Sequence, residues 1–359
     1  MKPKFGFGKS VALVGALGCI LGAMVTMGMS SQKDLKDAVK AGVEDFKFDF
    51  DDFKIATAEY ADGPTGLTLL YFPKSFSAAI DVRGGAAATR ESTILDPIST
   101  YPVVDAVVLA GGSTYGLEAA SGVMQKILES RGNRTDFDNI PSVASAVVYD
   151  FSGRTNALYP DKALGAQAFD QLVTNTVRIG RAGGGAYTSV GKYFGRKFAE
   201  RSGQGAAFKQ AGKLKVFVLT VVNACGNILD LNGNIVAGNL DPATGTRKPV
   251  AEQLMTELAQ IQPGAAPVKK DRSGNTTISI LVTNLKLDRS ALQRVAMMSH
   301  TAMGRVIEPF QSPDDGDTLF AVSTGTLELP ADQVGASEVG TLGGRALQEA
   351  VNEAIRVAR

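Results

Sequence analysis

Residues 271–285 read DRSGNTTISILVTNL, and this stretch decides how the rest of the chain is interpreted. A polar loop that contains glycine runs directly into an apolar, β-branched segment, which predicts a strand over residues 276–285. The first residue of that strand, Thr276, carries a hydroxyl group. Spacing alone leaves two interpretations open: an ordinary loop before a strand, or a nucleophile that becomes N-terminal when the chain cuts itself.

Self-cleavage between Asn275 and Thr276 would use the Thr276 hydroxyl. Backbone strain before Thr276 would let its Oγ1 attack the Asn275 carbonyl, so that the amide becomes an ester. Hydrolysis of that ester would free Thr276 as a new N-terminus. Its α-amine, whose ordinary pKa is about 7.7–8.0, can then act as the base for the hydroxyl of the same residue. This chemistry needs no histidine.

The chain is poor in the residues that many other catalytic sites need. It has 359 residues but one His, two Cys and no Trp. Cys19, Cys225 and His300 are too few for a structural zinc site, and two Cys do not form a disulfide framework. His300 lies near the apolar stripe of a predicted helix and is expected to be structural, while Cys225 is expected to be a core thiol. We expect neither a metal nor a cofactor.

An acidic turn, Asp314-Asp315-Gly316-Asp317, precedes a predicted strand at 318–323. Acidic residues at a turn are usually solvated. A divalent-metal loop would need further oxygen ligands at set spacing, which this segment lacks. Carboxylates beside an α-ammonium group or a lysine could, however, orient that group and shift its pKa.

The charge of the chain is balanced but unevenly distributed. Its 37 basic and 36 acidic residues give a net charge of +1, which offers no case for nucleic-acid binding. Lys2, Lys4 and Lys9 precede an uncharged, largely apolar stretch at 10–31. This pattern predicts a signal peptide or membrane anchor over 1–31, and hence an exported, periplasmic protein, with Cys19 as a possible lipid site. The alternative is an N-terminal arm on a cytoplasmic protein.

The remaining pattern predicts one compact α/β domain. A linker helix is expected at 32–47, from the helical spacing of its apolar residues, and the main domain at 48–359. Strands are predicted at 66–72, 78–82, 103–109, 213–222, 276–285 and 318–323, a hairpin turn at Asn232-Gly233, and helices at 113–130, 290–306 and 342–357.

Two glycine-rich segments suggest nucleotide binding only superficially. No clear strand leads into Gly180–Gly185 in the sequence, so a dinucleotide loop is not predicted there. Gly111-Gly112-Ser113 does lie between a strand and a helix, but it lacks the lysine of a phosphate-binding loop. A packing role is the simpler interpretation of both segments.

Several longer motifs, in the same order along the chain, resemble those of the L-aminopeptidase/D-esterase family and, within it, the nylon oligomer hydrolases, which are 6-aminohexanoate-oligomer endohydrolases. The resemblance runs from about residue 48 to the C-terminus and rests on Gly63–Thr68, Asp81–Ala86, Leu109–Ala119, Val147–Phe151, Tyr159–Gly165, Gly203–Phe208, Gly274–Ser279 and Asp315–Val322.

The resemblance implies an N-terminal-nucleophile hydrolase with a four-layer αββα sandwich, made as a precursor and cut between Asn275 and Thr276. The products would be an α chain, 1–275, and a β chain, 276–359. Thr276 would be the nucleophile and Asn223 an oxyanion donor. The remaining residues that it assigns to the active site are Lys192, Asp315, Asp317 and, at the substrate, Tyr149. It also implies a homo-oligomer, a dimer of dimers of αβ units.

Substrate identity stays open at this point. The leading hypothesis is hydrolysis of linear ω-amino-acid oligomers, such as 6-aminohexanoate oligomers. An aminopeptidase for β- or α-amino residues is the alternative within the same family. Acyl transfer in place of hydrolysis, and an inactive membrane-tethered binding protein, are further alternatives.

Overall fold

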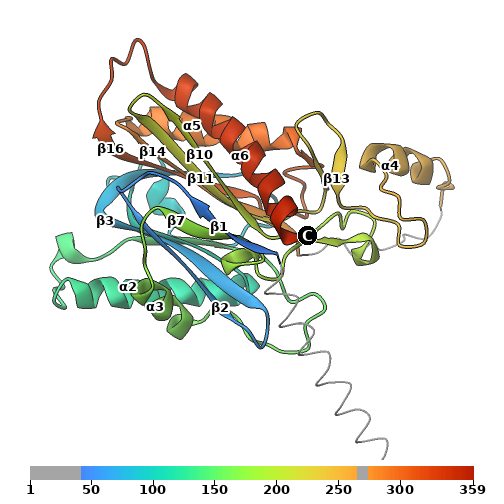
Figure 1. Cartoon of the computed structure of the whole chain (residues 1–359), viewed down its shortest axis with the longest axis horizontal. Coiled ribbons are helices and arrows are strands. Elements are labelled where there is room, and N and C mark those ends of the chain that lie inside the picture. Colours follow the sequence, from blue (N-terminus) through green and yellow to red (C-terminus); the bar gives the residue numbers. More distant parts are fainter. Residues whose placement is uncertain (1–41, 265–273) are drawn as a thin grey trace, which may run out of the picture.

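The computed structural model describes residues 42–264 and 274–359, and it has four layers (Figure 1). Helices α5 (Arg289–Ala302) and α6 (Ala336–Ala358) form one outer layer, and α2 (Ala119–Ser130) and α3 (Lys162–Asp170) form the other. Two layers of strands lie between them. The four-layer αββα arrangement expected from the resemblance is therefore confirmed.

The strand layer beneath α5 and α6 contains the strand that begins at Thr276. It consists of β10 (Gln204–Ala211), β11 (Leu214–Asn223), β14 (Thr276–Leu285) and β16 (Thr318–Leu327). β14 pairs antiparallel with β11 and parallel with β16, so that it is the inner strand between them. Central strands of this kind are apolar on both faces, which explains the nearly continuous apolar run of β14.

The second strand layer faces α2 and α3. Its strands are β2 (Lys54–Tyr60), β3 (Thr65–Val82), β5 (Val103–Ala110), β6 (Val143–Val147) and β4 (Thr89–Arg90). The sequence predicts two strands where the structure has the single long β3. Its first half pairs with β2 and its second half with β16, so β3 joins the two layers. A shift in its pairing with β5 between Tyr71 and Phe76 coincides with Pro73, Lys74 and Ser75, which separate the two predicted strands.

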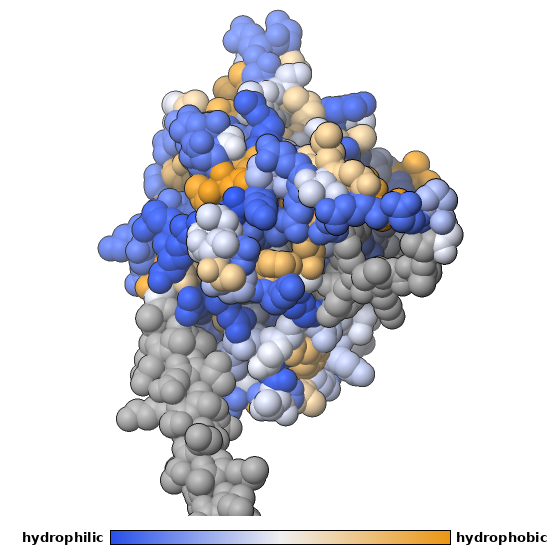
Figure 2. Space-filling model, turned by 90° about the vertical axis from the view of Figure 1, so that its right-hand side faces the viewer, coloured by the Kyte–Doolittle hydropathy of each residue, from blue (hydrophilic) through white to orange (hydrophobic). Residues whose placement is uncertain are grey.

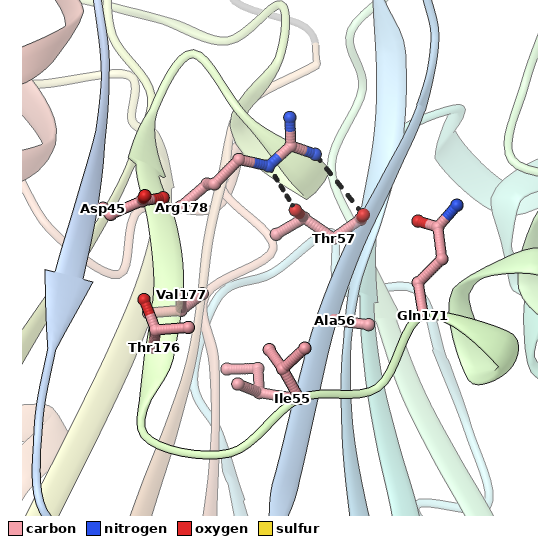
Figure 3. A pocket seen from close by; sticks show the side chains of 9 residues that line it. Asp45, Ile55, Ala56, Thr57, Gln171, Thr176, Val177 and Arg178 are labelled. Atoms are coloured by element: carbon pink, nitrogen blue, oxygen red, sulfur yellow. Dashed lines mark hydrogen bonds between the residues drawn. The ribbon is translucent and has the colours of Figure 1, made fainter.

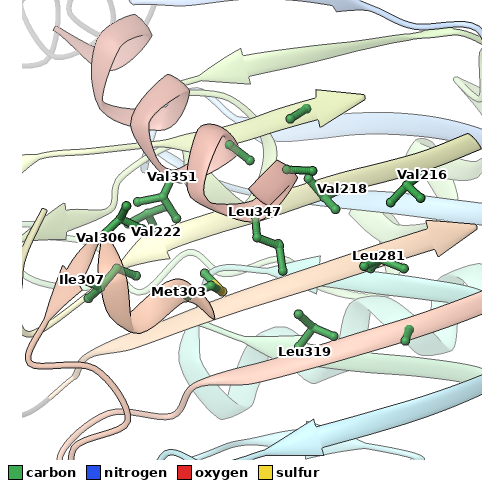
Figure 4. Packing of buried hydrophobic residues seen from close by; sticks show 14 of the residues in the cluster. Val216, Val218, Val222, Leu281, Met303, Val306, Ile307, Leu319, Leu347 and Val351 are labelled. Atoms are coloured by element: carbon green, nitrogen blue, oxygen red, sulfur yellow. The ribbon is translucent and has the colours of Figure 1, made fainter. Parts of the chain in front are cut away.

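Three hydrophobic clusters fill the spaces between the four layers. The first lies between α5 and α6 and their strands and includes Leu347 and Leu281 (Figure 4). The second lies between the two strand layers, where Phe217 and Phe320 are fully buried. The third packs α2 and α3 against β3 and β5. Because side chains alternate along a strand, neighbouring residues such as Phe217 and Val218 belong to different clusters.

Smaller elements surround this sandwich. β1 (Val43–Lys47) pairs with β7 (Thr176–Gly180) at one edge. The hairpin predicted at Asn232-Gly233 is confirmed, since it joins β12 (Asn227–Leu229) to β13 (Ile235–Ala237). The others are β8 (Ser189–Val190), β9 (Glu200–Arg201), β15 (Ile307–Glu308) and α4 (Val250–Leu258). The face that carries α4 is mostly hydrophilic, with small separate apolar patches (Figure 2).

Two further sequence predictions need correction. The linker helix expected over 32–47 is wrong for its last part, because Val43–Lys47 is a strand that hydrogen-bonds to β7, and these backbone bonds outweigh the helical spacing. A strand, β7, does lead into Gly180–Gly185, contrary to the sequence interpretation. It was missed because it is short and interrupted by the polar Arg178. Gly183–Gly185 is nonetheless a buried 3₁₀ turn, consistent with a packing role.

The predicted signal peptide or anchor at 1–31, including Cys19, and residues 32–41 of the linker lie outside the described residues. Within 42–264 and 274–359, no helix has the length and apolar character needed to cross a membrane.

Candidate active site

Five of the sequence-predicted site residues meet where three strands of one layer come together. Thr276 is the first residue of β14, and it lies directly opposite Asn223, the last residue of β11. Asp315 and Asp317 lie just before β16, and Asn275 forms a parallel bridge with Asp315. The pairing of β11, β14 and β16 thus brings together residues more than 90 positions apart in the chain.

The Thr276 hydroxyl lies against the peptide bond that the sequence predicts to be cut. Its Oγ1 donates a hydrogen bond to the Asn275 carbonyl oxygen. The backbone N–H of Gly316 donates to the same oxygen at 3.1 Å. An N–H in this position is suited to stabilise the negative charge that develops on a carbonyl oxygen under attack. The hydroxyl, the carbonyl and a polarising donor are therefore assembled in the continuous chain.

Gly316 is a functional candidate that the sequence interpretation missed. A Cβ at this position would lie 2.7 Å from the Thr276 Oγ1, so only glycine brings this backbone close to the hydroxyl. Its position between two candidate aspartates was the only signal, and a backbone N–H leaves no pattern of side chains to detect.

Lys192 and Asn223 form a buried pair beside this peptide bond. The Lys192 Nζ donates to the Asn223 backbone oxygen and to its Oδ1, both at 2.9 Å. The Asn223 Nδ2 donates to the Gly274 oxygen at 3.0 Å and to the Tyr149 oxygen at 3.1 Å. In the continuous chain, the amide predicted to bind an oxyanion is thus engaged by Gly274, the residue before Asn275.

The two aspartates are held by backbone N–H groups. Asp315 accepts from the Cys225 N–H at 3.2 Å and from the Ser312 hydroxyl at 2.7 Å. Asp317 accepts from the N–H of Thr277, next to the candidate nucleophile, at 2.7 Å. These bonds fix the turn 315–317 against the start of β14. The prediction that such an acidic turn is usually solvated does not hold here, since both carboxyl groups are buried.

Burial shifts the pKa values of these groups toward neutral pH. It lowers the pKa of the Lys192 amine to about 7, although the Asp315 carboxylate attracts the charged form. Burial and the nearby Asp315 raise the pKa of Asp317 to about 8, and burial raises the pKa of Asp315. Lys192 and Asp317, whose pKa values are about 7 and 8, can therefore gain and lose protons near neutral pH, as acid–base catalysis requires.

Tyr149 also lies at the site. Its backbone oxygen accepts from Asn223, and its ring packs so closely on Gly274 that a Cβ there would be 2.5 Å from the ring. Gly274 has a φ of +78°, which favours glycine. The guanidinium group of Arg196 lies 5.4 Å from the centre of the Tyr149 ring.

His300 and Cys225 have the buried environments expected of them. The His300 Nδ1 is 2.8 Å from the Asp81 carboxylate, its ring packs edge-on against Phe310, and burial lowers its pKa. Cys225 is buried two residues after Asn223, and it contributes its backbone N–H to Asp315.

A cavity of about 280 Å³ opens beside Lys192. Its described lining consists of Ser152, Gly153, Ser189, Lys192, Arg196, Ala199 and Arg201. A larger cavity, of about 390 Å³, lies between β2 and β7 around Thr57 and Arg178 (Figure 3). None of the candidate site residues lines it, so the smaller cavity is the better candidate for a substrate site.

Comparison with known proteins gives consistent matches. The sequence model that describes peptidase family S58 matches residues 49–359 of this chain. The 6-aminohexanoate-oligomer endohydrolase of Paenarthrobacter ureafaciens is 38% identical over 330 residues, which is 89% of each chain.

Two solved structures share the fold at low sequence identity. The L-aminopeptidase D-Ala-esterase/amidase of Ochrobactrum anthropi, described as a variant of the Ntn (N-terminal-nucleophile) hydrolase fold, superposes with a TM-score of 0.59 at 17% identity, covering 86% of this chain and 84% of that one. A β-aminopeptidase of Burkholderia sp. gives a TM-score of 0.56 at 17% identity, covering 89% and 85%. The Ntn hydrolase fold implied by the resemblance is thereby confirmed.

Proposed function

Since this chain belongs to peptidase family S58, we propose that it cuts itself between Asn275 and Thr276 and then hydrolyses amide bonds with Thr276 as the N-terminal nucleophile. The chain is an amide hydrolase of the Ntn type. One observation carries the residue assignment: the Thr276 hydroxyl contacts the carbonyl of Asn275, while Gly316 donates to that same oxygen.

The proposed self-cleavage has two steps, an acyl shift from nitrogen to oxygen and hydrolysis of the resulting ester. Thr276 Oγ1 bonds to the Asn275 carbonyl carbon, and the oxyanion is held by the Gly316 N–H. The C–N bond breaks, and the proton lost by the hydroxyl ends on the freed nitrogen. Water then hydrolyses the ester, which gives a carboxyl group on Asn275 and an amine on Thr276.

Cleavage also frees groups for the proposed catalytic cycle. Once the bond is cut, Gly274 and Asn275 can withdraw, which releases the Asn223 Nδ2 from the Gly274 oxygen. That donor then serves the oxyanion of a substrate amide. The Thr276 amine takes the hydroxyl proton, and the substrate's acyl group is transferred to Oγ1 and then to water. Lys192, Asp315 and Asp317 position the amine and adjust its pKa.

We propose linear ω-amino-acid oligomers, of the 6-aminohexanoate type, as substrates that are cut internally. The family relatives with 38% identity support this choice. The cavity supports it as well, because its described lining contains lysine and arginine but no carboxylate. An aminopeptidase must bind the free ammonium group of its substrate, and a cationic lining repels that group.

Product analysis tests this substrate assignment. Processed protein is incubated with a 6-aminohexanoate oligomer and with the same oligomer acetylated at its amine, and Thr276→Ala serves as the inactive control. Internal cleavage of the acetylated oligomer is expected. Release of single units from the free oligomer, with the acetylated one left intact, would show an aminopeptidase. In a further incubation an amine is added to the oligomer, and products joined to that amine would show acyl transfer.

We further propose that residues 10–31 direct export or membrane attachment of the enzyme, and that its αβ units form a homo-oligomer, a dimer of dimers. The uncharged stretch that follows three lysines supports the first proposal. Cell fractionation and mass spectrometry of the N-terminus would test it, including any lipid on Cys19. Light scattering would test the second.

A further inference from the structure

Gly274 places a carbonyl group where the proposed catalytic cycle needs the carbonyl of a substrate. Its oxygen accepts from the Asn223 Nδ2 at 3.0 Å and from the Lys192 Nζ at 3.5 Å. That Asn223 amide is the donor proposed for the substrate oxyanion. Asn223 also lies directly opposite Thr276, the proposed nucleophile, in the pairing of β11 with β14. In the uncut chain, Gly274 therefore occupies the position of an acyl group beside the nucleophile.

The Cα of Gly274 packs against the inner part of the Tyr149 side chain. A Cβ added to Gly274 would lie 2.5 Å from the Tyr149 Cδ1, 2.9 Å from its Cγ and 3.2 Å from its Cβ. Carbon atoms in favourable contact are about 3.5–4.0 Å apart, so these distances are repulsive. Rotation of the ring about its Cβ–Cγ bond moves Cδ1 but leaves Cγ and Cβ in place. A substituent at this position would therefore meet the tyrosine in every orientation of its ring.

Neighbouring groups hold Tyr149 in this position. Its backbone oxygen accepts from the Asn223 Nδ2 at 3.1 Å, and its ring packs edge-on against Phe151, with 5.6 Å between the ring centres. The Arg154 guanidinium lies 4.4 Å from the centre of the Phe151 ring and donates to Asp150, the residue after Tyr149, at 2.8 Å. The side chains of Asp150 and Arg154 are buried. Moving the tyrosine away from Gly274 would disturb these contacts.

We propose that Tyr149 selects substrates whose acyl group has an unsubstituted CH2 next to the carbonyl carbon, and that Gly274 marks the place of this CH2 in the uncut chain. Linear ω-amino acids such as 6-aminohexanoate have such a CH2. Every L-α-amino acid except glycine carries a side chain on that carbon instead. The substrate class is thereby narrowed to amides that are unbranched beside the carbonyl. This inference rests on the proposed function.

The test compares an acetylated 6-aminohexanoate trimer with two analogues, each methylated once in the middle unit. In the first analogue, of R configuration, the methyl is on the carbon next to the carbonyl and takes the place of the Cβ of an L residue. In the second, it is on the carbon that bears the nitrogen, at the far end of the same unit. The measured quantity is kcat/KM for cleavage of the amide bond after the middle unit.

Wild type, Tyr149→Ala and Tyr149→Phe are compared, and rates are expressed per amount of processed protein. Tyr149→Ala removes Cγ and Cδ1 but keeps the backbone oxygen that holds Asn223. Tyr149→Phe keeps the whole ring and is the matched control. The ratio of the two analogues cancels any general loss of activity in a variant.

Wild type is expected to cleave the first analogue roughly 10–100-fold less efficiently than the second, because the methyl overlaps with Tyr149. Tyr149→Phe should keep this ratio. In Tyr149→Ala the ratio should fall to about threefold or less, since the atoms that cause most of the overlap are gone.

Equal kcat/KM of wild type for the two analogues would overturn the inference, and this comparison needs no variant. A wild-type ratio that persists in Tyr149→Ala would overturn it as well. Neither result affects the proposed function, which fails separately if processed wild type does not hydrolyse the unmethylated trimer.

Discussion

Asn223 is the residue at which the continuous chain and the proposed enzyme differ most. Its side-chain amide donates to Gly274 and Tyr149 before cleavage and is proposed to donate to the substrate oxyanion afterwards. Gly316 supplies the donor at the Asn275 oxygen. Self-cleavage and turnover would therefore use different oxyanion donors, and only one of them is a side chain that the sequence could reveal.

Asn223→Ala is expected to lower kcat by about 10²–10³, because one oxyanion donor is lost while the nucleophile remains. The measurement is steady-state hydrolysis of a 6-aminohexanoate oligomer by the processed fraction of the variant. Asn232→Ala, in the exposed turn between β12 and β13, is the matched control and should retain wild-type kcat. A kcat of Asn223→Ala within threefold of wild type would remove Asn223 from the proposed mechanism.

The lowered pKa of Lys192 predicts that the stability of the protein depends on pH. Its pKa is about 7 in the folded chain, against an ordinary value of 10.5. Between these two pH values the unfolded chain binds a proton that the folded chain does not, so this group makes the free energy of unfolding rise with pH, by at most about 1.4 kcal/mol per pH unit.

Urea denaturation at pH 7 to 10 tests this expectation, with Thr276→Ala as the uncut reference. Thr276→Ala/Lys192→Met should lack the contribution of Lys192, so the stability difference between the two proteins should grow in favour of the reference as the pH increases. A difference that is constant across this range would contradict the lowered pKa.

At the scale of elements, α6 packs closely against the strands beneath it. Gly205 of β10 lies against the backbone of α6, where a Cβ would meet the Ala350 oxygen and the Ala354 nitrogen. Backbone cannot move aside as the end of a flexible side chain can.

Gly205→Ala is expected to lower the free energy of unfolding by about 1–3 kcal/mol, through overpacking of α6 against β10. Gly304→Ala is the matched control, because a Cβ at that exposed glycine meets no atom within 4 Å. It should change stability by no more than about 0.5 kcal/mol. Both are measured by denaturation in the Thr276→Ala background. Equal stabilities of the two variants would show that this contact is not tight.

The elements that the sequence predicted are those with strong apolar patterns. β14 begins and ends where the sequence predicts, and α5 and α6 were located from their apolar stripes. β7 and β1 were missed because they are short and form an edge, where backbone pairing rather than apolar pattern decides the structure. The single β3 was predicted as two strands because Pro73, Lys74 and Ser75 interrupt its apolar pattern.

At the scale of the whole molecule, the candidate site also contains features that the sequence predicted and features that it missed. The apolar, β-branched run identified a strand starting at Thr276. It could not bring Asn223, Lys192 and Asp315 to that strand, because long-range strand pairing leaves no local pattern. Those residues came from the resemblance to a family. The cavity beside Lys192 was not predicted at all, since Arg196 and Arg201 stand in elements of only two or three residues and meet only through the fold.

The central claim is that the chain cuts itself with Thr276, and intact mass spectrometry of purified protein tests it most directly. Wild type is predicted to give a fragment of 84 residues that begins at Thr276 and ends at Arg359, together with its N-terminal partner. Thr276→Ser, which keeps a hydroxyl, should give the corresponding fragment, and Thr276→Ala should give only uncut chain. A Thr276→Ala protein that is still cut after Asn275 would contradict the account.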